Sequence, residues 1–230
     1  SKMPSLWALL ESPLMTSLRR AVGRHLPERL RGAGPFGPRY ELATRYLAGL
    51  RGIEIGGAAH NRYPVEAINV DRAPVPDAAY REAQMELAGE VATVDLVAEG
   101  DRLPLPDKST DFVLASHVIE HFPDPVGALL EWERVATRYL FIVVPHHERT
   151  FDSGRPLTSA NELMRRHEEG FASDEDRHWS VWDCAGFVDL CRRLGLEVVA
   201  TEDPDRKVGN GFAVVIAVGP DRPIGSAQPS

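Results

Sequence analysis

The chain of 230 residues has only two cysteines, no excess of basic charge and no long apolar run. Cys184 and Cys191 lie seven positions apart on one face of a predicted helix, too close to frame a fold by a disulfide, so free thiols in a reducing compartment are expected. No apolar run approaches the roughly 20 residues of a membrane span, and no basic segment followed by an apolar one marks a secretory leader. These absences predict a cytoplasmic protein.

The balance of charged residues argues against a nucleic-acid-binding protein. With 26 Lys and Arg against 34 Asp and Glu, the formal net charge is −8, whereas a nucleic-acid-binding face needs clustered basic residues. The densest basic stretch, residues 19–31, is interrupted by Pro27 and Glu28. At 43% hydrophobic and 26% charged residues, the composition is that of an ordinary globular protein. The expected partners are therefore small molecules, not nucleic acids or membranes.

The N-terminal segment has a helical pattern. Apolar residues recur at helical spacing over residues 4–31, broken by Pro13 and Pro27, and a second helix is predicted over residues 39–50. Such a helical arm offers a surface for a second copy of the chain, so we expect a homodimer. The predicted units are the arm (1–49), the main domain (50–219) and a flexible tail rich in Pro, Gly and Ser (220–230).

The main domain alternates strands with helices. Apolar, β-branched runs of strand length are typical of strands buried on both faces of a parallel sheet. An amphipathic helix over residues 125–137 gives βαβ alternation, and the class is therefore α/β. After a helix over residues 181–194, two strands joined by a polar loop predict an antiparallel hairpin. The predicted strands are 53–55, 67–70, 92–94, 112–115, 139–144, 196–201 and 211–219.

Chemically informative residues follow the first four strands. The run Glu54-Ile55-Gly56-Gly57 ends the first, and glycines there let backbone N–H groups approach a ligand. Asp71 ends the second strand, where an acid suits ribose hydroxyls. The third is followed by Glu99-Gly100-Asp101, and the fourth by Ser116-His117-Val118-Ile119-Glu120-His121.

In this order and spacing, residues 50–145 resemble the class I S-adenosylmethionine-dependent methyltransferases. The resemblance implies a doubly wound, seven-stranded, mostly parallel sheet of the Rossmann-like kind with an antiparallel last strand, and S-adenosylmethionine as cofactor. The loop G-G-A-A departs from the usual G-x-G-x-G, and Pro64 leaves little room for the usual first helix, so we expect a turn remodelled around His60 and Asn61. The implied contacts are Glu54, Gly56 and Gly57 on the methionine moiety, Asp71 on the ribose, Glu99, Gly100 and Asp101 beside the adenine, and Ser116 and His117 in the methyl-transfer cleft.

Residues 117–121 also match the H-x-x-E-H pattern of inverted zinc proteases, which places both histidines on one helix. Here the motif directly follows a buried strand, and Pro123 and Pro125 cut short any helix, so the sequence disfavours this interpretation. Packing or capping is the plain alternative for either histidine.

Histidines are the candidate bases. His146 follows the fifth strand, and an imidazole there suits removal of a hydroxyl proton. His121 and His147 are the other candidates for this base. The alternative is that His146 and His147 are polar loop residues without a catalytic function. Glu120 and His121, with Glu148 and Asp152, also offer ligands for a divalent metal, with Mg²⁺ expected.

The long polar segment 146–180 predicts an acceptor-binding insertion or lid, partly helical over residues 161–169. Trp179 and Trp182 either stack on a sugar or pack in the core. The stretch P-H-H-E-R-T-F-D-S-G-R-P-L-T and the chain length are similar to the sugar 1-O-methyltransferases of methylmannose polysaccharide biosynthesis. That resemblance implies a small saccharide acceptor, methylated at the 1-OH of a short 3-O-methylated mannoside. The alternatives are a methyltransferase of another small molecule (a macrolide sugar, quinone or phenol) and a non-catalytic nucleotide-binding or scaffold protein of this fold.

Overall fold

The structure, a computed structural model, describes residues 38–219. The predicted helix over residues 4–31 and the predicted tail 220–230 lie outside this range, and the homodimer expected from the arm stays a prediction. The helices are α3 (Glu41–Leu47), α4 (Ala78–Ala88), α5 (Pro125–Val135), α6 (Ala160–Glu169) and α7 (Cys184–Arg193), with short 3-10 turns η3 (Pro38–Tyr40), η4 (Ala59–Asn61), η5 (Ile119–His121) and η6 (His147–Arg149).

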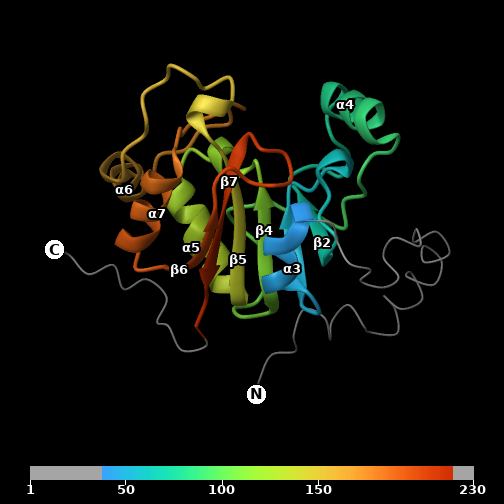
Figure 1. The fold of residues 1–230 in the computed structure, drawn as a ribbon, viewed down its shortest axis with the longest axis horizontal. Helices are drawn as coiled ribbons and strands as arrows, with labels where there is room; N and C mark the ends of the chain where they lie inside the picture. The colour runs from blue at the N-terminus through green and yellow to red at the C-terminus, as the bar shows by residue number, and fades with distance from the viewer. Residues whose placement is uncertain (1–37, 220–230) are drawn as a thin grey trace.

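Seven strands form one sheet in the order β3-β2-β1-β4-β5-β7-β6 (Figure 1). Strands β1 to β5 run parallel, and β7 is antiparallel to both of its neighbours, β5 and β6. The chain steps outward from β1 through β2 to β3, then crosses back to place β4 on the other side of β1. The fold class is therefore confirmed. The strands are β1 (Arg51–Ile55), β2 (Glu66–Asp71), β3 (Leu96–Val97), β4 (Thr110–Ser116), β5 (Ala136–Pro145), β6 (Glu197–Glu202) and β7 (Gly211–Ala217).

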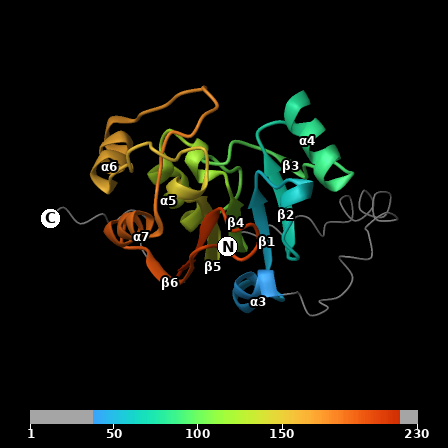
Figure 2. The ribbon, with the colours of Figure 1, turned by 45° about the horizontal axis from the view of Figure 1, so that its top comes forward.

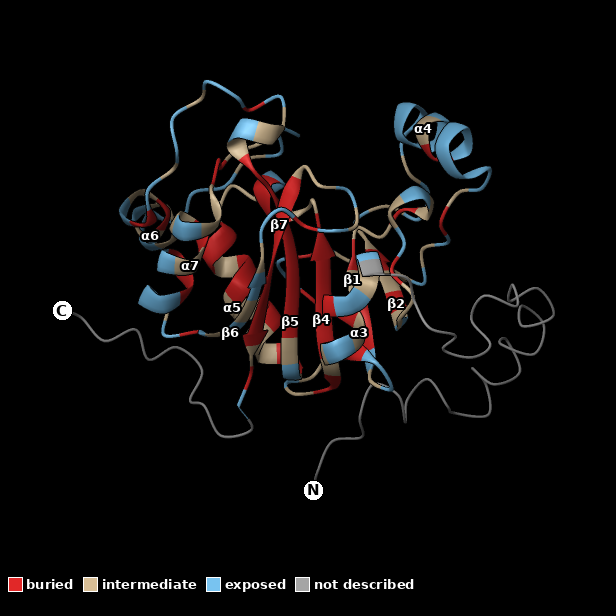
Figure 3. Cartoon of the chain, in the orientation of Figure 1, coloured by how far each residue is buried: buried red, intermediate tan, exposed pale blue. Residues whose placement is uncertain are grey.

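Helices cover both faces of the sheet. On β4, Val113 and Ala115 pack into a cluster with α5 and α7, whereas Phe112 and Leu114 face a second cluster with α3. This alternation follows from the two-residue period of a strand, and burial of both faces explains the uninterrupted apolar runs. The central strands are buried almost throughout (Figure 3). Helix α4 lies near β2, at the opposite end of the molecule from α6 and α7 (Figure 2).

The prediction for the third strand was wrong. Residues 92–94 form no strand, and β3 is the two-residue segment Leu96–Val97. The backbone of the predicted segment is bonded by side chains instead: Ala92 N–H donates to Gln84 Oε1 (2.9 Å), and Thr93 O accepts from Asn69 Nδ2 (2.9 Å). Pairing to β2 starts only at Leu96, opposite Val70.

Sequence periodicity also missed helix α4, because the only buried residue of this helix is polar: Gln84. The residues at the two ends of α4 are nevertheless typical helix caps. The side chain of Asp77 accepts from Tyr80 N–H (2.9 Å) at the N-terminus, and Gly89 closes the helix at φ +73°. The other helices predicted within the described residues are confirmed to within a few positions, including the helix over residues 161–169, which is α6.

Two further predictions concern the environment of the chain. None of the helices within residues 38–219 combines the length and the apolar composition that a membrane crossing requires. Both cysteines are free thiols, and burial raises the pKa of Cys184 to about 11 and that of Cys191 to about 12. The cytoplasmic location stays a prediction.

Candidate functional site

The turn after β1 is built around two glycines. Gly56 has φ +64°, a conformation that favours glycine, and its N–H donates to Val70 O (2.8 Å). A Cβ on Gly57 would lie 2.7 Å from Asn69 Oδ1 and 2.9 Å from Glu54 Cδ. The Gly57 N–H donates to the same Asn69 oxygen (2.9 Å). Side chains at either position would therefore crowd the edge of the sheet where β1 and β4 separate.

The chain after Gly57, where a remodelled turn was expected around His60 and Asn61, makes a short 3-10 turn. Residues 59–61 form η4, whose Ala59 N–H donates to Gln84 Oε1 (2.8 Å). Asn61 Nδ2 donates to Ser116 Oγ (3.0 Å), which ties this turn to the end of β4. From the β6–β7 loop, Lys207 Nζ donates to Asn61 O (2.6 Å), and burial lowers the pKa of Lys207 to about 8. Gln84 and Lys207 are site residues that the sequence did not reveal.

The acidic residues predicted to contact the cofactor follow neighbouring strands. Burial raises the pKa of Glu54 to about 7, although Lys207 and Arg62 oppose the shift. Asp71 ends β2, where its carboxylate accepts from Ala73 N–H (3.3 Å).

The segment after β3 is a turn with two exposed acids, Glu99 and Asp101, on either side of the buried Gly100. A Cβ on Gly100 would lie 2.8 Å from Ile55 Cγ2, and the Gly100 carbonyl accepts from Trp132 Nε1 (2.8 Å). The glycine therefore fixes the position of this turn against β1 and α5.

The end of β4 delivers the remaining predicted cofactor residues. Ser116 is buried, and His117 adopts φ +56°, an uncommon conformation for a side-chain-bearing residue. Burial lowers the pKa of His117, so the ring is neutral near pH 7. Residues 119–121 then form a single 3-10 turn, so the H-x-x-E-H motif is not on a helix of the kind that inverted zinc proteases use.

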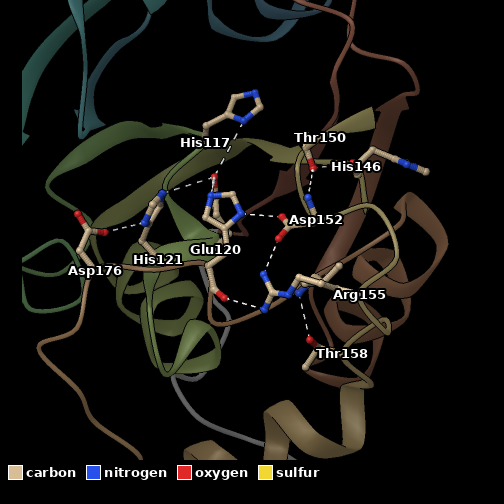
Figure 4. A network of polar contacts seen from close by, with 11 residues as sticks. His117, Glu120, His121, His146, Thr150, Asp152, Arg155, Thr158 and Asp176 are labelled. Atoms are coloured by element: carbon tan, nitrogen blue, oxygen red, sulfur yellow. Dashed lines mark hydrogen bonds and ion pairs between the residues drawn. The ribbon is translucent and has the colours of Figure 1, made fainter. Parts of the chain in front are cut away.

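Glu120 is the centre of a histidine cluster (Figure 4). Its side chain is 1% exposed, and burial raises its pKa to about 8. Oε1 of Glu120 lies 3.9 Å from His121 Nε2, 3.9 Å from His178 Nε2 and 4.0 Å from His117 Nδ1. The structure thus joins two predicted metal ligands, Glu120 and His121, to a histidine from the insertion.

The other predicted metal ligands, Asp152 and Glu148, pair with other side chains. Asp152 Oδ2 lies 2.6 Å from His178 Nδ1, and its other oxygen accepts from Arg155. Glu148 is exposed, with Oε1 3.9 Å from His147 Nε2. The Mg²⁺ site expected from these four side chains stays a prediction.

His146, the first candidate base, is buried at the carboxyl end of β5, and its ring points away from Glu120 (Figure 4). Its Nδ1 accepts from Glu148 N–H (3.2 Å), and its ring contacts those of His147 and Phe212. Burial lowers its pKa, so the neutral form predominates at pH 7, with the ring proton on Nε2 in this geometry.

The insertion forms an open pocket of about 810 Å³ beside the cluster. Trp182 is buried against Phe187, so of the two uses weighed for it, core packing is the one observed. Trp179 packs against Phe171 and Arg177. Phe151 is the most exposed of the large hydrophobic side chains among the described residues, at 79%. The pocket is lined by His121, Phe151, Arg155, Glu175, Asp176, Arg177 and His178.

Comparisons with known proteins agree with this architecture. Residues 49–139 match the family model of a methyltransferase domain. Haemonchus contortus phosphoethanolamine N-methyltransferase 1, solved with phosphoethanolamine and S-adenosylhomocysteine, has a similar fold: 14% identity, TM-score 0.50, over 84% of this chain and 44% of that one. A chain from the complex containing the Haloferax volcanii Trm112 methyltransferase activator aligns at 16% identity and TM-score 0.50, over 90% and 96% of the two chains.

The chain has the S-adenosylmethionine-dependent methyltransferase fold. A Thermotoga maritima S-adenosylmethionine-dependent methyltransferase also aligns, at 19% identity and TM-score 0.49, over 93% of this chain and all of that one. No curated protein matches the sequence. The family model and the two alignments at TM-score 0.50 establish the fold alone, and the acceptor has to be inferred from the site.

The residues at this sheet edge fit the methyltransferase cofactor. Gly57 leaves the space that a Cβ would fill beside Asn69, at the point where β1 and β4 separate. Ligands bind to open α/β sheets at such switch points, outside the carboxyl ends of the strands. The neighbouring acids, Glu54 and Asp71, suit a ligand that carries a cationic sulfonium and ribose hydroxyls.

Proposed function

We propose that the protein is an S-adenosylmethionine-dependent O-methyltransferase that methylates a sugar hydroxyl, the 1-OH of a short 3-O-methylated mannoside. The observation that carries this proposal is the position of η5: it begins two residues after His117, at the cofactor edge, and its last residue, His121, lines the polar pocket. A donor and an acceptor would thus meet at one turn of the chain.

The cofactor supplies a methyl group on a sulfonium centre. Glu54, Gly56 and Gly57 would hold its methionine end, and Asp71 its ribose diol. Glu99, Gly100 and Asp101 would border the adenine, while Ser116 and His117 would face the methyl-transfer cleft. Since the sulfonium is already an activated leaving group, alignment of the acceptor oxygen is the principal task of the remaining residues.

The pocket suits a hydroxylated acceptor better than a quinone or phenol. The pocket is lined by charged and hydrogen-bonding side chains together with one exposed phenyl ring, that of Phe151. An aromatic face can pack on the C–H surface of a pyranose, while Arg155 and Asp176 bind its hydroxyls. An apolar ring system would displace water from these polar groups and offer no hydrogen bonds in exchange, at a cost of about 1–3 kcal/mol for each group that becomes buried and unsatisfied.

Proton removal from the hydroxyl is the second task. His121 has Nδ1 2.9 Å from Asp176 Oδ1, which leaves its Nε2 lone pair free. His146 has its Nδ1 lone pair engaged by Glu148 N–H, so an acceptor hydroxyl would have to take the place of that donor. Both remain candidates, and the two single variants separate them.

A radiolabelled methyl-transfer screen over methylated and unmethylated mannosides tests the proposal. We expect label in the 3-O-methylated mannosides and its loss when the 1-OH is already blocked. Label in a quinone or phenol and in no mannoside would contradict the sugar assignment. Titration calorimetry with S-adenosylmethionine and S-adenosylhomocysteine separates the non-catalytic alternative, because a scaffold that has lost the cofactor site would bind neither.

A further inference from the structure

Two imidazole nitrogens and one carboxylate oxygen converge beside the pocket. Within residues 38–219, ligand atoms of Glu120, His121 and His178 all lie within 4.8 Å of one another. Both histidines present Nε2 to the same carboxylate oxygen, at 3.9 Å each. We infer that these three side chains form a binding site for a divalent transition-metal ion of the zinc class.

The opposite side of each ring is held by an acid. Nδ1 of His178 lies 2.6 Å from Asp152 Oδ2, and Nδ1 of His121 lies 2.9 Å from Asp176 Oδ1 (Figure 4). A neutral imidazole that donates from Nδ1 to a carboxylate keeps its lone pair on Nε2. Metal-binding histidines are typically oriented in this way, with a carboxylate or carbonyl on the far nitrogen. Here both rings have that arrangement, and both lone pairs face Glu120.

Glu120 supplies the second, independent observation. Its side chain is 1% exposed, and its Oε2 has no hydrogen-bond partner among the described residues. A buried carboxyl oxygen without a hydrogen-bond partner is costly, because it has lost its hydration and gained no bond in exchange. A cation between Oε1, Oε2 and the two imidazoles would satisfy the carboxylate.

The donor set selects the class of ion. Mg²⁺ prefers oxygen ligands in octahedral geometry, whereas two histidines and one carboxylate are a donor set of zinc and related ions. Asp152 does not add an oxygen ligand to this donor set, because its two oxygens are engaged by His178 and Arg155. The site therefore favours a transition metal over the Mg²⁺ expected from the sequence.

The ion would also connect two parts of the chain. Glu120 and His121 belong to η5, whereas His178 belongs to the insertion, whose next residue, Trp179, donates its N–H to Glu120 O (2.7 Å). Because His121 and His178 both line the pocket, a fourth coordination position is available to an oxygen ligand from that side. An ion on Nε2 of His121 uses the lone pair that proton transfer would need, and this leaves His146 as the candidate base.

This inference does not depend on methyl transfer, so its test measures metal binding directly. The full chain, stripped with chelator and dialysed, is titrated with Co²⁺, whose visible d–d absorption reports coordination by nitrogen and oxygen. We expect saturation at one ion per chain and displacement by Zn²⁺ but not by equimolar Mg²⁺. His178→Ala and His121→Ala should abolish the absorption band, and Asp176→Asn should weaken Co²⁺ binding about 10–100-fold.

His167→Ala is the matched control, because His167 also pairs with an acid through Nδ1 (2.8 Å to Asp124 Oδ2) but lies outside the cluster. His121 is 39% exposed, so its alanine variant is expected to fold, and circular dichroism verifies this. Three results would each overturn the inference: no Co²⁺ band in the wild type, an unchanged band in folded His121→Ala, or displacement of Co²⁺ by equimolar Mg²⁺. Methyl-transfer activity plays no part in any of them.

Discussion

Asn69 and Gly57 hold each other through a reciprocal pair of hydrogen bonds. The Gly57 N–H donates to Asn69 Oδ1 (2.9 Å), and Asn69 Nδ2 donates to Gly57 O (3.0 Å). The same amide nitrogen also donates to Thr93 O (2.9 Å). One side chain from β2 therefore fixes two segments: the glycine turn after β1, which is predicted to border the cofactor, and the segment that leads to β3.

Asn69→Ala should consequently weaken cofactor binding. The loss of two hydrogen bonds to the turn is worth about 1–3 kcal/mol, and each 1.4 kcal/mol of lost preorganisation corresponds to a tenfold higher Kd. Calorimetric titration with S-adenosylhomocysteine measures the change. Asn161→Ala is the control, because the Asn161 side chain accepts a hydrogen bond from an exposed arginine, Arg193, instead of bonding the glycine turn. Equal affinities for the two variants would show that the Asn69 amide does not preorganise the site.

Gly56→Ala tests the crowding of the same turn. A Cβ at Gly56 would lie 2.9 Å from Val118 Cγ2, whereas a Cβ at Gly89, which has a similar positive φ, meets nothing within 4 Å. Both variants incur the backbone strain of about 1 kcal/mol, and only Gly56→Ala adds a steric clash. We expect a larger fall in Tm for Gly56→Ala than for Gly89→Ala, measured by thermal unfolding. Equal falls would mean that Val118 moves aside without cost.

The pKa of Glu54 predicts a pH-dependent contribution to stability. Since burial raises this pKa from 4.5 to about 7, the folded state binds the proton more tightly than the unfolded chain. The contribution of protonated Glu54 to the free energy of unfolding is fully present below about pH 4.5 and is lost as the pH rises through about 7. The loss amounts to at most about 3 kcal/mol, and the partial exposure of the side chain reduces it.

Glu54→Gln removes this titration. The variant should therefore gain stability relative to the wild type between pH 5 and pH 8, as measured by urea unfolding at each pH. Taking the difference between the two proteins cancels the contributions of other groups, such as Glu120. Glu66→Gln, on the exposed end of β2, is the matched control. A difference that stays constant across this pH range would contradict the raised pKa.

The sequence predicted most of the fold because the strong signals were local. Apolar runs identified β4 and β5, since burial on both faces leaves few polar positions in such strands, and Ile53 and Ile55 on either side of Glu54 identified β1. The errors fall where side chains, not backbone pairing, satisfy the peptide groups. Asn69 and Gln84 bond the segment predicted as the third strand, and helix α4 buries a glutamine where periodicity requires an apolar residue.

The sequence predicts which residues lie at the end of each strand, but not which residues from the loops and the insertion reach them. Glu54, Asp71 and Ser116 follow from their positions after strands, because parallel strands bring their carboxyl ends to one edge. The contact of His178 with Glu120 could not be predicted, because it depends on how a long insertion returns to the sheet. Lys207 reaches Asn61 for a similar reason, from a loop that the sequence marks only as polar.

His146→Ala tests proton transfer. If this residue accepts the hydroxyl proton, kcat should fall about 10²–10⁴-fold with little change in KM, because general-base catalysis acts on the transition state. The acid limb of the pH profile should also disappear, since it reports the protonation of this ring. His147→Ala, the neighbouring imidazole on η6, is the comparison. Retained turnover in His146→Ala would transfer the base role to His121.

Phe151→Ala tests the acceptor pocket. The ring is 79% exposed and lies 4.5 Å, centroid to centroid, from that of His178, so truncation removes contact area without opening a cavity in the core. If it packs on a pyranose, KM for the mannoside should rise about tenfold with kcat little changed, because such a contact is made equally in the ground and transition states. Phe171→Ala is the matched control, since Phe171 belongs to the same insertion but packs against Trp179 outside the pocket lining. Steady-state kinetics with a 3-O-methylated mannoside measures both variants, and an unchanged KM in Phe151→Ala would place the acceptor elsewhere along the sheet edge.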